Sequence, residues 1–186
     1  SDVYKRQILI SSIPVMLIGF FLVETNLIEN LRNIKVIAWT TLIFGIILYF
    51  SDKCDLSKNI ENNFSFKSAI FIGTFQILSL IPGVSRSGIT LTAARILNFN
   101  RFDSAKISFL LSLPTLGAVS IFGLNNTLSS NNMNFSITNI LCIILSFLFS
   151  ILTIKYFLNF VRKFSLKIFV IYRVLLGVIL LFLSYL

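Results

Sequence analysis

The chain has 186 residues, of which 56% are hydrophobic and only 12% are charged, and its mean hydropathy is +0.90. About a quarter of the residues of a soluble domain are charged, so this composition excludes an ordinary soluble domain and indicates a polytopic membrane protein. The formal charge of +9 does not indicate nucleic-acid binding, because the basic residues form no single stripe with interleaved aromatics. Cys54 and Cys142 lack disulfide or metal-ligand spacing, and the sequence contains no histidine.

Five apolar stretches predict five membrane-spanning helices, at residues 8–23, 36–50, 107–124, 140–160 and 168–186. The first two have only about 16 and 15 residues, fewer than the roughly 20 that a span requires, so their flanks should contribute. Lys5 and Arg6 before the first stretch also resemble the start of a signal peptide. Because no small-residue cleavage site follows, a true membrane helix is favoured. Residues 1–186 are expected to form a single membrane domain.

A further apolar region, residues 68–99, is interrupted in its middle. Residues 68–81 are too few to cross a bilayer comfortably, Pro82 and Gly83 break the segment, and a second short segment follows at residues 89–99. Two short helices joined by a glycine-rich tip predict a re-entrant hairpin, which enters and leaves the membrane on the same side. The predicted fold class is an all-α polytopic membrane protein with five transmembrane helices and one re-entrant helical hairpin.

The distribution of basic residues agrees with a re-entrant hairpin. Ten basic residues then fall on one face of the membrane and two, Arg32 and Lys35, on the other. The positive-inside rule makes the first face cytoplasmic, and the uncharged connector 125–138 lies outside. The ten residues of the cytoplasmic face are Lys5, Arg6, Lys53, Lys58, Lys67, Arg101, Lys106, Arg162, Lys163 and Lys167.

The tip of this hairpin has the composition of a phosphate pocket. A charged side chain at membrane depth is unfavourable by about 2.5–3.5 kcal/mol on insertion scales, which makes Arg86 a functional candidate. Its guanidinium offers a planar fork of donors to a phosphate, and a helix beginning near Ser87 would add its positive dipole end. Alternatively, Pro82 and Gly83 merely kink a helix and the serines bond the preceding turn. The hydroxyl residues and glycines assigned to phosphate binding beside Arg86 are Ser85, Ser87, Thr90, Gly83 and Gly88.

Five other polar residues have more than one interpretation. Gln76 could hydrogen-bond into the pocket or pack between helices. Arg95 and Arg101 lie further along, where a side chain can snorkel to the interface, and we expect both to be structural. Lys155 and Arg173, in the last two spans, could snorkel, pair with lipid phosphate or line the cavity, and a structural role is favoured for both.

No carboxylate falls inside an apolar stretch or in the hairpin. Hydrolysis of a phosphoanhydride requires an activated water or nucleophile, and usually a metal held by carboxylates. The tip is therefore predicted to be an anion-binding site that lacks the acid–base residues needed for hydrolysis. The seven acidic residues are Asp2, Glu24, Glu29, Asp52, Asp55, Glu61 and Asp103.

Four segments resemble, in order and spacing, the bacitracin-resistance type of undecaprenyl-diphosphatases. The resemblance implies a membrane hydrolase that removes one phosphate from undecaprenyl diphosphate and recycles the lipid carrier for cell-wall synthesis. It further implies six spans and two re-entrant hairpins related as inverted repeats, with a cavity open to the outer face of the bacterial cytoplasmic membrane. The segments are Gly73-Thr-Phe-Gln76, Ile81-Pro-Gly-Val-Ser-Arg-Ser-Gly88 with Thr90, Ser108-Phe-Leu-Leu-Ser-Leu-Pro114, and Tyr172-Arg173.

By this resemblance Arg86 clamps the diphosphate, beside Ser85, Ser87 and Thr90, while it stays open whether a serine is the nucleophile. A divalent cation, Mg²⁺ or Ca²⁺, is implied as cofactor, with ligands outside this chain. Family members carry an earlier hairpin with paired glutamates and a histidine. The chain is expected to be the C-terminal two-thirds of that fold and inactive alone, with Ser1 to Gln7 matching no part of the family. The expected partners are the polyprenyl diphosphate and the membrane, with a second copy of the chain as a candidate.

Two other functions stay open on the sequence. A transporter or channel would use the hairpin as an anion-binding gate, with Arg86 as the selectivity charge. A non-catalytic subunit would assemble through its apolar faces and would tolerate Arg86→Ala.

Overall fold

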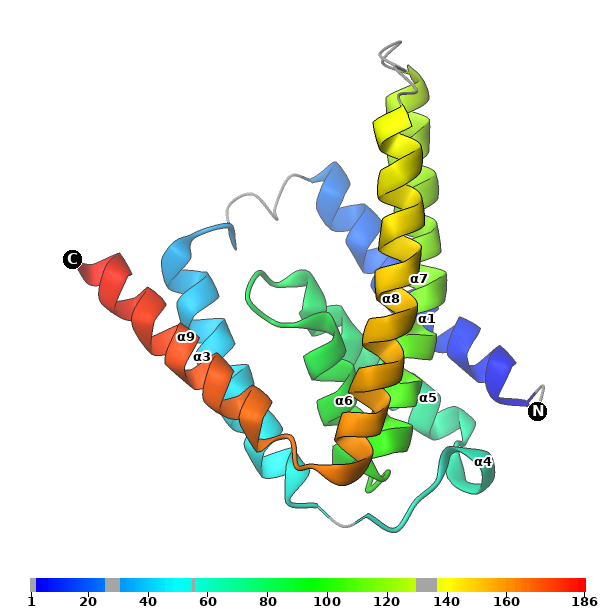
Figure 1. Cartoon of the computed structure of the whole chain (residues 1–186), viewed down its shortest axis with the longest axis vertical. Helices are drawn as coiled ribbons and strands as arrows, with labels where there is room; N and C mark the ends of the chain where they lie inside the picture. The colour runs from blue at the N-terminus through cyan, green and yellow to red at the C-terminus, as the bar shows by residue number, and fades with distance from the viewer. Residues whose placement is uncertain (1–2, 26–30, 55, 130–136) are drawn as a thin grey trace.

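The computed structural model of the chain describes residues 3–25, 31–54, 56–129 and 137–186, and most of them are helical. Five helices in these ranges are long and apolar enough to cross a membrane (Figure 1). The all-α polytopic fold class and the prediction of five spans are therefore confirmed. The five helices are α1 (Val3–Glu24), α3 (Ile34–Asp52), α7 (Arg101–Ser129), α8 (Ile137–Lys163) and α9 (Lys167–Tyr185).

The helices extend beyond the apolar stretches. As expected from their short hydrophobic segments, α1 and α3 recruit flanking residues and reach 22 and 19 residues. The extension of α3 beyond the apolar stretch 36–50 places Asp52 at its end in a buried position, while the apolar stretches themselves contain no acidic residue. The backbone of α7 stays helical to Ser129, which makes the first residues of the predicted connector 125–138 helical. Residues 130–136 of that connector lie outside the described residues, and its last two residues begin α8.

Between α3 and α7 lie the short helix α4 (Ile60–Asn63) and two short helices with a break between them, as predicted for the hairpin. The first arm is α5 (Phe66–Ile77), which a 3-10 turn η1 (Leu78–Leu80) continues, and the second arm is α6 (Arg86–Ile96). The arms pack against each other, and the hairpin starts and ends at the same end of the bundle (Figure 1). The last turn of α3, the start of α7 and the connection between α8 and α9 also lie at that end. This end carries most of the basic residues, and its assignment to the cytoplasm stays a prediction.

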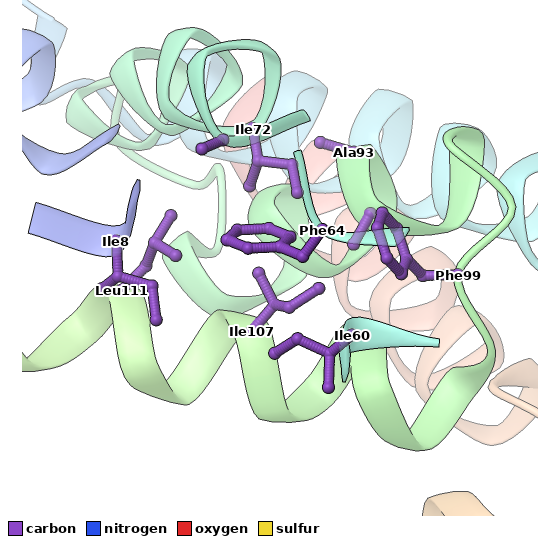
Figure 2. Packing of buried hydrophobic residues seen from close by; sticks show 10 residues of the cluster. Ile8, Ile60, Phe64, Ile72, Ala93, Phe99, Ile107 and Leu111 are labelled. Carbon is purple, nitrogen blue, oxygen red and sulfur yellow. The ribbon is translucent and has the colours of Figure 1, made fainter. Parts of the chain in front are cut away.

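Two clusters of buried apolar side chains hold the hairpin. The first joins both arms to α1, α4 and α7 (Figure 2), and the second joins α6 to α3, α7, α8 and α9. Because lipid tails are as apolar as these side chains, close packing must supply much of the attraction between the helices. Gly73 of α5 illustrates this, since a Cβ there would lie 2.2 Å from the carbonyl oxygen of Ser11 on α1. The main members of the first cluster are Ile8, Ile60, Phe64, Ile72, Phe99, Ile107 and Leu111.

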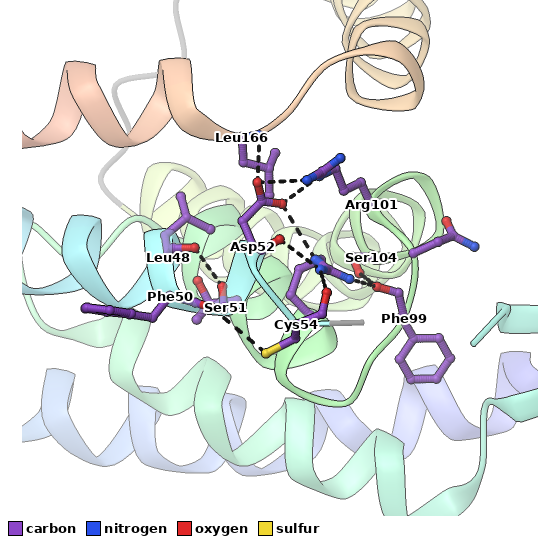
Figure 3. A network of polar contacts seen from close by, with 12 residues as sticks. Leu48, Phe50, Ser51, Asp52, Cys54, Phe99, Arg101, Ser104 and Leu166 are labelled. Atoms are coloured by element: carbon purple, nitrogen blue, oxygen red, sulfur yellow. Dashed lines mark hydrogen bonds and ion pairs between the residues drawn. The ribbon is translucent and has the colours of Figure 1, made fainter. Parts of the chain in front are cut away.

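A buried polar network fixes the base of the hairpin (Figure 3). Arg101 donates from Nε to Oδ1 of Asp52 at 2.7 Å and from Nη2 to Oδ2 at 3.1 Å. The backbone N–H of Leu166 donates to Oδ2 of Asp52 at 3.2 Å. One carboxylate thus ties α3 to the start of α7 and to the connection between α8 and α9.

Arg95 belongs to the same network and has no exposed surface. Its Nε lies 3.7 Å from Oδ1 of Asp52, and its guanidinium donates to the carbonyl oxygens of Asp52, Cys54 and Phe99 (Figure 3). Arg95 therefore does not snorkel to the interface, and its contacts agree with the expectation that it is structural. The guanidinium turns inward because a carboxylate from α3 and three backbone carbonyls meet it there.

Candidate functional site

The tip of the hairpin, residues 81–85, is held against α3 and α9. Gly83 has a φ of +90°, and a Cβ there would lie 2.1 Å from Oγ1 of Thr40. Oγ1 of Thr40 lies 2.7 Å from the carbonyl oxygen of Pro82, and Nη2 of Arg173 donates to the carbonyl oxygen of Gly83 at 2.9 Å. A left-handed φ and the contact with α3 both require glycine at position 83. Contact of Gly83 with a phosphate stays a prediction.

The second arm starts with a capped helix end that points into the middle of the molecule. Ser85 is the N-cap residue of α6, and its Oγ accepts from the backbone N–H of Gly88 at 3.2 Å. The helix begins at Arg86, one residue before the predicted start. The N-terminus of a helix carries a positive partial charge and favours an anion in front of it. Ser85 and Ser87 are exposed there, with their hydroxyl oxygens 3.4 Å apart.

Gln76 orients the guanidinium of Arg86. The Gln76 side chain is fully buried, and with its amide oxygen turned toward Arg86 it accepts from Nε at 3.3 Å and from Nη2 at 3.2 Å. A guanidinium has five N–H donors, so the amide occupies one edge and leaves Nη1 and one hydrogen of Nη2 for a ligand. Of the two interpretations of Gln76, the structure favours a polar contact at the tip, made through Arg86.

Thr90 and Ser108 connect the tip to α7. Oγ1 of Thr90 lies 2.7 Å from Oγ of Ser108 and 3.0 Å from the carbonyl oxygen of Arg86, and only 1% of Thr90 is exposed. Ser108 in turn donates to the carbonyl oxygen of Ser87 at 3.2 Å. Sequence reasoning did not include Ser108 among the site residues, although it begins one of the segments that carry the family resemblance.

Two cavities lie beside the tip and share Ser87, Ser108, Phe109 and Thr153. The first, of about 600 Å³, is lined by Ser85, Ser87, Gly88 and Arg173 and by apolar residues of α3, α8 and α9. The second, of about 820 Å³, is lined by Gln76, Arg86, Ser87 and Thr90 and by residues of α7 and α8. Together the two cavities contact every side chain predicted to bind phosphate.

Arg173 of α9 is a member of the site that sequence reasoning placed elsewhere. A structural role was favoured for it, but only 8% of it is exposed, and a Cβ on Gly88 would lie 2.7 Å from its Nη1. Snorkelling is ruled out because α9 packs against α3 and turns this residue toward the tip. Gly88 thus leaves room for the second guanidinium. Lys155 of α8, in contrast, is exposed as expected.

The donors around the tip suit an anion and do not suit a metal cation. No carboxylate or imidazole is among the described residues that line the two cavities. Within the described ranges, no three His, Cys, Asp or Glu residues come together as a metal site. The polar side chains present are guanidinium ions, hydroxyls, an amide and the single thiol of Cys142, and the guanidinium charge would repel a cation. These residues therefore do not fit the implied Mg²⁺ or Ca²⁺.

Comparison with known proteins assigns the family. The sequence model described as "Bacitracin resistance protein BacA" matches residues 3–179. The chain belongs to the BacA family. Because the match begins at residue 3, the expectation that Ser1 to Gln7 matches no part of the family is wrong for residues 3–7.

BacA-family relatives share the same name in different bacteria. The undecaprenyl-diphosphatase of Pelagibacter ubique is 50% identical over 180 residues, which are 96% of this chain and 70% of that protein. The undecaprenyl-diphosphatase of Jannaschia sp. is 37% identical over 178 residues, with 96% of this chain and 67% of that protein covered. That of Saccharophagus degradans is 40% identical over 172 residues, with 91% and 63% covered. The chain spans about two-thirds of the length of these relatives.

Proposed function

We propose that this BacA-family protein hydrolyses undecaprenyl diphosphate to undecaprenyl phosphate and phosphate, recycling the lipid carrier for cell-wall synthesis. One observation carries the proposal. Arg86 and Arg173 flank Ser87 at the N-terminus of α6, and within the described ranges neither forms an ion pair with a carboxylate. Two guanidinium charges whose protein partners are neutral are suited to a ligand with two phosphate groups. The names of the relatives agree with this chemistry.

In this proposal the tip binds the diphosphate and stabilises charge during transfer. Water adds to the terminal phosphorus and gives a proton to a base from outside the described residues, the bond from that phosphorus to the bridging oxygen breaks, and the prenyl phosphate leaves with the electron pair. Arg86 and the N-terminus of α6 offset the negative charge on the transferred group, while Arg173 holds the other phosphate. The hydroxyls of Ser85 and Ser87 add hydrogen bonds. The described residues at the cavities include no carboxylate or imidazole that could activate the water.

A divalent cation is part of the proposal only through the family resemblance. When bound, such a cation would neutralise phosphate charge and activate water. We expect its ligands and the acid–base groups to come from outside the residues described. We place the protein in the bacterial cytoplasmic membrane with the cavities open to the outer face, since most basic residues lie at the other end. A homodimer stays a prediction.

Phosphate release from undecaprenyl diphosphate by the full-length protein, reconstituted in liposomes, tests the proposal. We expect release by the wild type and a loss of about 10²–10³-fold for Arg86→Ala, because one charged stabiliser of the transferred group is removed. Arg6→Ala, which removes an exposed arginine near the start of α1, is the matched control and should keep full activity. Anion flux without phosphate release would instead support the transporter alternative. Unchanged release by Arg86→Ala would contradict the assignment.

A further inference from the structure

Ser108 of α7 forms hydrogen bonds with another helix. Hydroxyl side chains in membrane helices commonly donate to a carbonyl of the preceding turn of their own helix. Ser112 and Thr115, one and two turns later on α7, do so over oxygen–oxygen distances of 2.6 and 3.1 Å. Oγ of Ser108 lies instead 2.7 Å from Oγ1 of Thr90 and 3.2 Å from the carbonyl oxygen of Ser87, both in α6. The need to satisfy a buried hydroxyl does not by itself explain this contact, because the carbonyls of α7 could do so.

The pair of hydroxyls from Ser108 and Thr90 holds the backbone at the start of α6. Oγ1 of Thr90 lies 3.0 Å from the carbonyl oxygen of Arg86. Each hydroxyl has one hydrogen, and the structure allows either to be the donor in their mutual bond. In one arrangement Ser108 donates to Thr90, which donates to the carbonyl of Arg86. In the other, Thr90 donates to Ser108, which donates to the carbonyl of Ser87. Both arrangements tie α7 to a carbonyl of the first turn of α6.

This contact lies inside the packing between α6 and α7. Only 1% of Thr90 and 5% of Ser108 are exposed. A buried hydroxyl that loses its partner is left unsatisfied, so the pair resists separation. The guanidinium of Arg86 is oriented by Gln76 of α5, which belongs to the hairpin itself. Arg86 is thus held at its side chain from within the hairpin and at its backbone from α7.

We propose that Ser108 is a positioning residue for hydrolysis of the diphosphate. The inference rests on the proposed function of the tip, and it adds a residue that acts on the site through another helix. Through Thr90 and the carbonyl of Ser87, Ser108 fixes the first turn of α6 and with it the place of Arg86 against the transferred phosphate. A group that stabilises the transition state must be placed accurately, whereas binding of the ground state tolerates a small shift. Loss of the Ser108 hydroxyl should therefore lower kcat more than it raises KM.

Removal of this hydroxyl in the full-length protein tests the proposal. For Ser108→Ala we expect kcat for phosphate release from undecaprenyl diphosphate to fall about tenfold, with KM within about twofold of the wild type. Thr115→Val is the matched control, since it removes a hydroxyl of the same helix that is also 5% exposed, bonds within α7 and lines neither cavity. Its kcat should equal that of the wild type. An equal fall in both variants would overturn the specific role of Ser108.

A double-mutant cycle separates positioning from a general effect on the fold. If Ser108 acts through Arg86, its loss should matter little once that guanidinium is gone. We expect Ser108→Ala to lower kcat by less than about twofold when it is added to Arg86→Gln, because the effects of residues that act together do not add. A further tenfold fall in the double variant would show that Ser108 acts independently of Arg86, and would overturn the proposal.

The outcomes also separate this proposal from the one on which it rests. An active wild type and an unchanged kcat for Ser108→Ala would overturn the positioning role and leave the phosphatase assignment intact. A wild type that releases no phosphate would overturn the proposed function, and this inference with it. If Ser108→Ala does not fold, Ser108→Cys replaces the hydroxyl with a weaker donor of similar shape. A lowered kcat for that variant would support the proposal, and a kcat equal to that of the wild type would contradict it.

Discussion

The base and the tip of the hairpin each hold two arginines, and the two pairs differ in their partners. At the base, Arg95 and Arg101 share the carboxylate of Asp52. At the tip, Arg86 contacts an amide and Arg173 contacts a backbone carbonyl. The base is therefore neutralised largely by the protein itself, while the charge at the tip has no counterion among the described residues.

Burial alone does not separate these two regions. Arg95 is completely buried, whereas Arg86 is only partly buried, so burial alone would single out Arg95, which is not the arginine proposed to bind phosphate. An arginine whose charge is paired with a carboxylate has no free charge to offer a ligand, and its replacement should lower the stability of the protein. An arginine oriented by neutral groups keeps its charge available for an anionic ligand. The partner of the guanidinium therefore distinguishes the structural end of the hairpin from the end that we propose binds the ligand.

The largest expected effect comes from removing the counterion at the base. Asp52→Asn leaves Arg95 buried without a negative charge, and breaking a buried pair is unfavourable by about 3 kcal/mol or more. We expect a marked fall in the melting temperature in detergent, while the molecules that stay folded keep their turnover. Glu61→Gln, at an exposed acidic residue, is the control and should melt like the wild type. Equal melting temperatures for the two variants would show that charge pairing does not hold the base.

A second prediction concerns the shape of the tip. In Gly83→Ala the new Cβ would overlap Thr40 and the backbone would be strained, so the turn must move away from α3. Because small displacements of a catalytic group are expensive, turnover should fall about 100-fold. Gly117→Ala in α7 is the control, since no atom lies within 4 Å of the added Cβ, and its phosphate release should be normal. Normal release by Gly83→Ala would mean that the contact with α3 does not position Arg86.

A smaller effect is expected when the tip is made to resemble the base. Gln76→Glu would place a carboxylate beside Arg86, where it competes with phosphate for the guanidinium. We expect KM for undecaprenyl diphosphate to rise about tenfold, because a charge-assisted contact inside the protein replaces part of the one to the ligand. Gln76→Leu removes the amide without adding charge and should raise KM less. A KM for Gln76→Glu no higher than that for Gln76→Leu would contradict the idea that a free charge defines the tip.

The sequence predicted the spans and the interrupted segment because a membrane restricts length and backbone conformation. A helix that crosses the bilayer must be long and apolar, and Pro82 with Gly83 in an apolar region is a visible break. Arg86 was also visible, since a charge among apolar residues is unusual. These features depend on residues close together in the chain, so the sequence could predict them without knowledge of the tertiary structure.

What the sequence did not predict depends on contacts between distant segments. Arg95 was expected to be structural, but its buried position was not foreseen because nothing local shows that Asp52, 43 residues earlier, lies beside it. Arg173 was assigned a structural role because the packing of α9 against α3 is not evident from either helix alone. For the same reason Ser108, whose hydroxyl meets Thr90 across two helices, was absent from the candidate site.

The most direct test compares one arginine from each end of the hairpin in the full-length protein. Arg86→Gln and Arg95→Gln are measured in parallel for phosphate release from undecaprenyl diphosphate and for melting temperature. We predict that Arg86→Gln loses release by about 100-fold or more and melts like the wild type, because its charge serves the ligand. Arg95→Gln should melt at a lower temperature and keep its turnover per folded molecule. The reverse pattern, with stability lost at Arg86 and release lost at Arg95, would contradict the account.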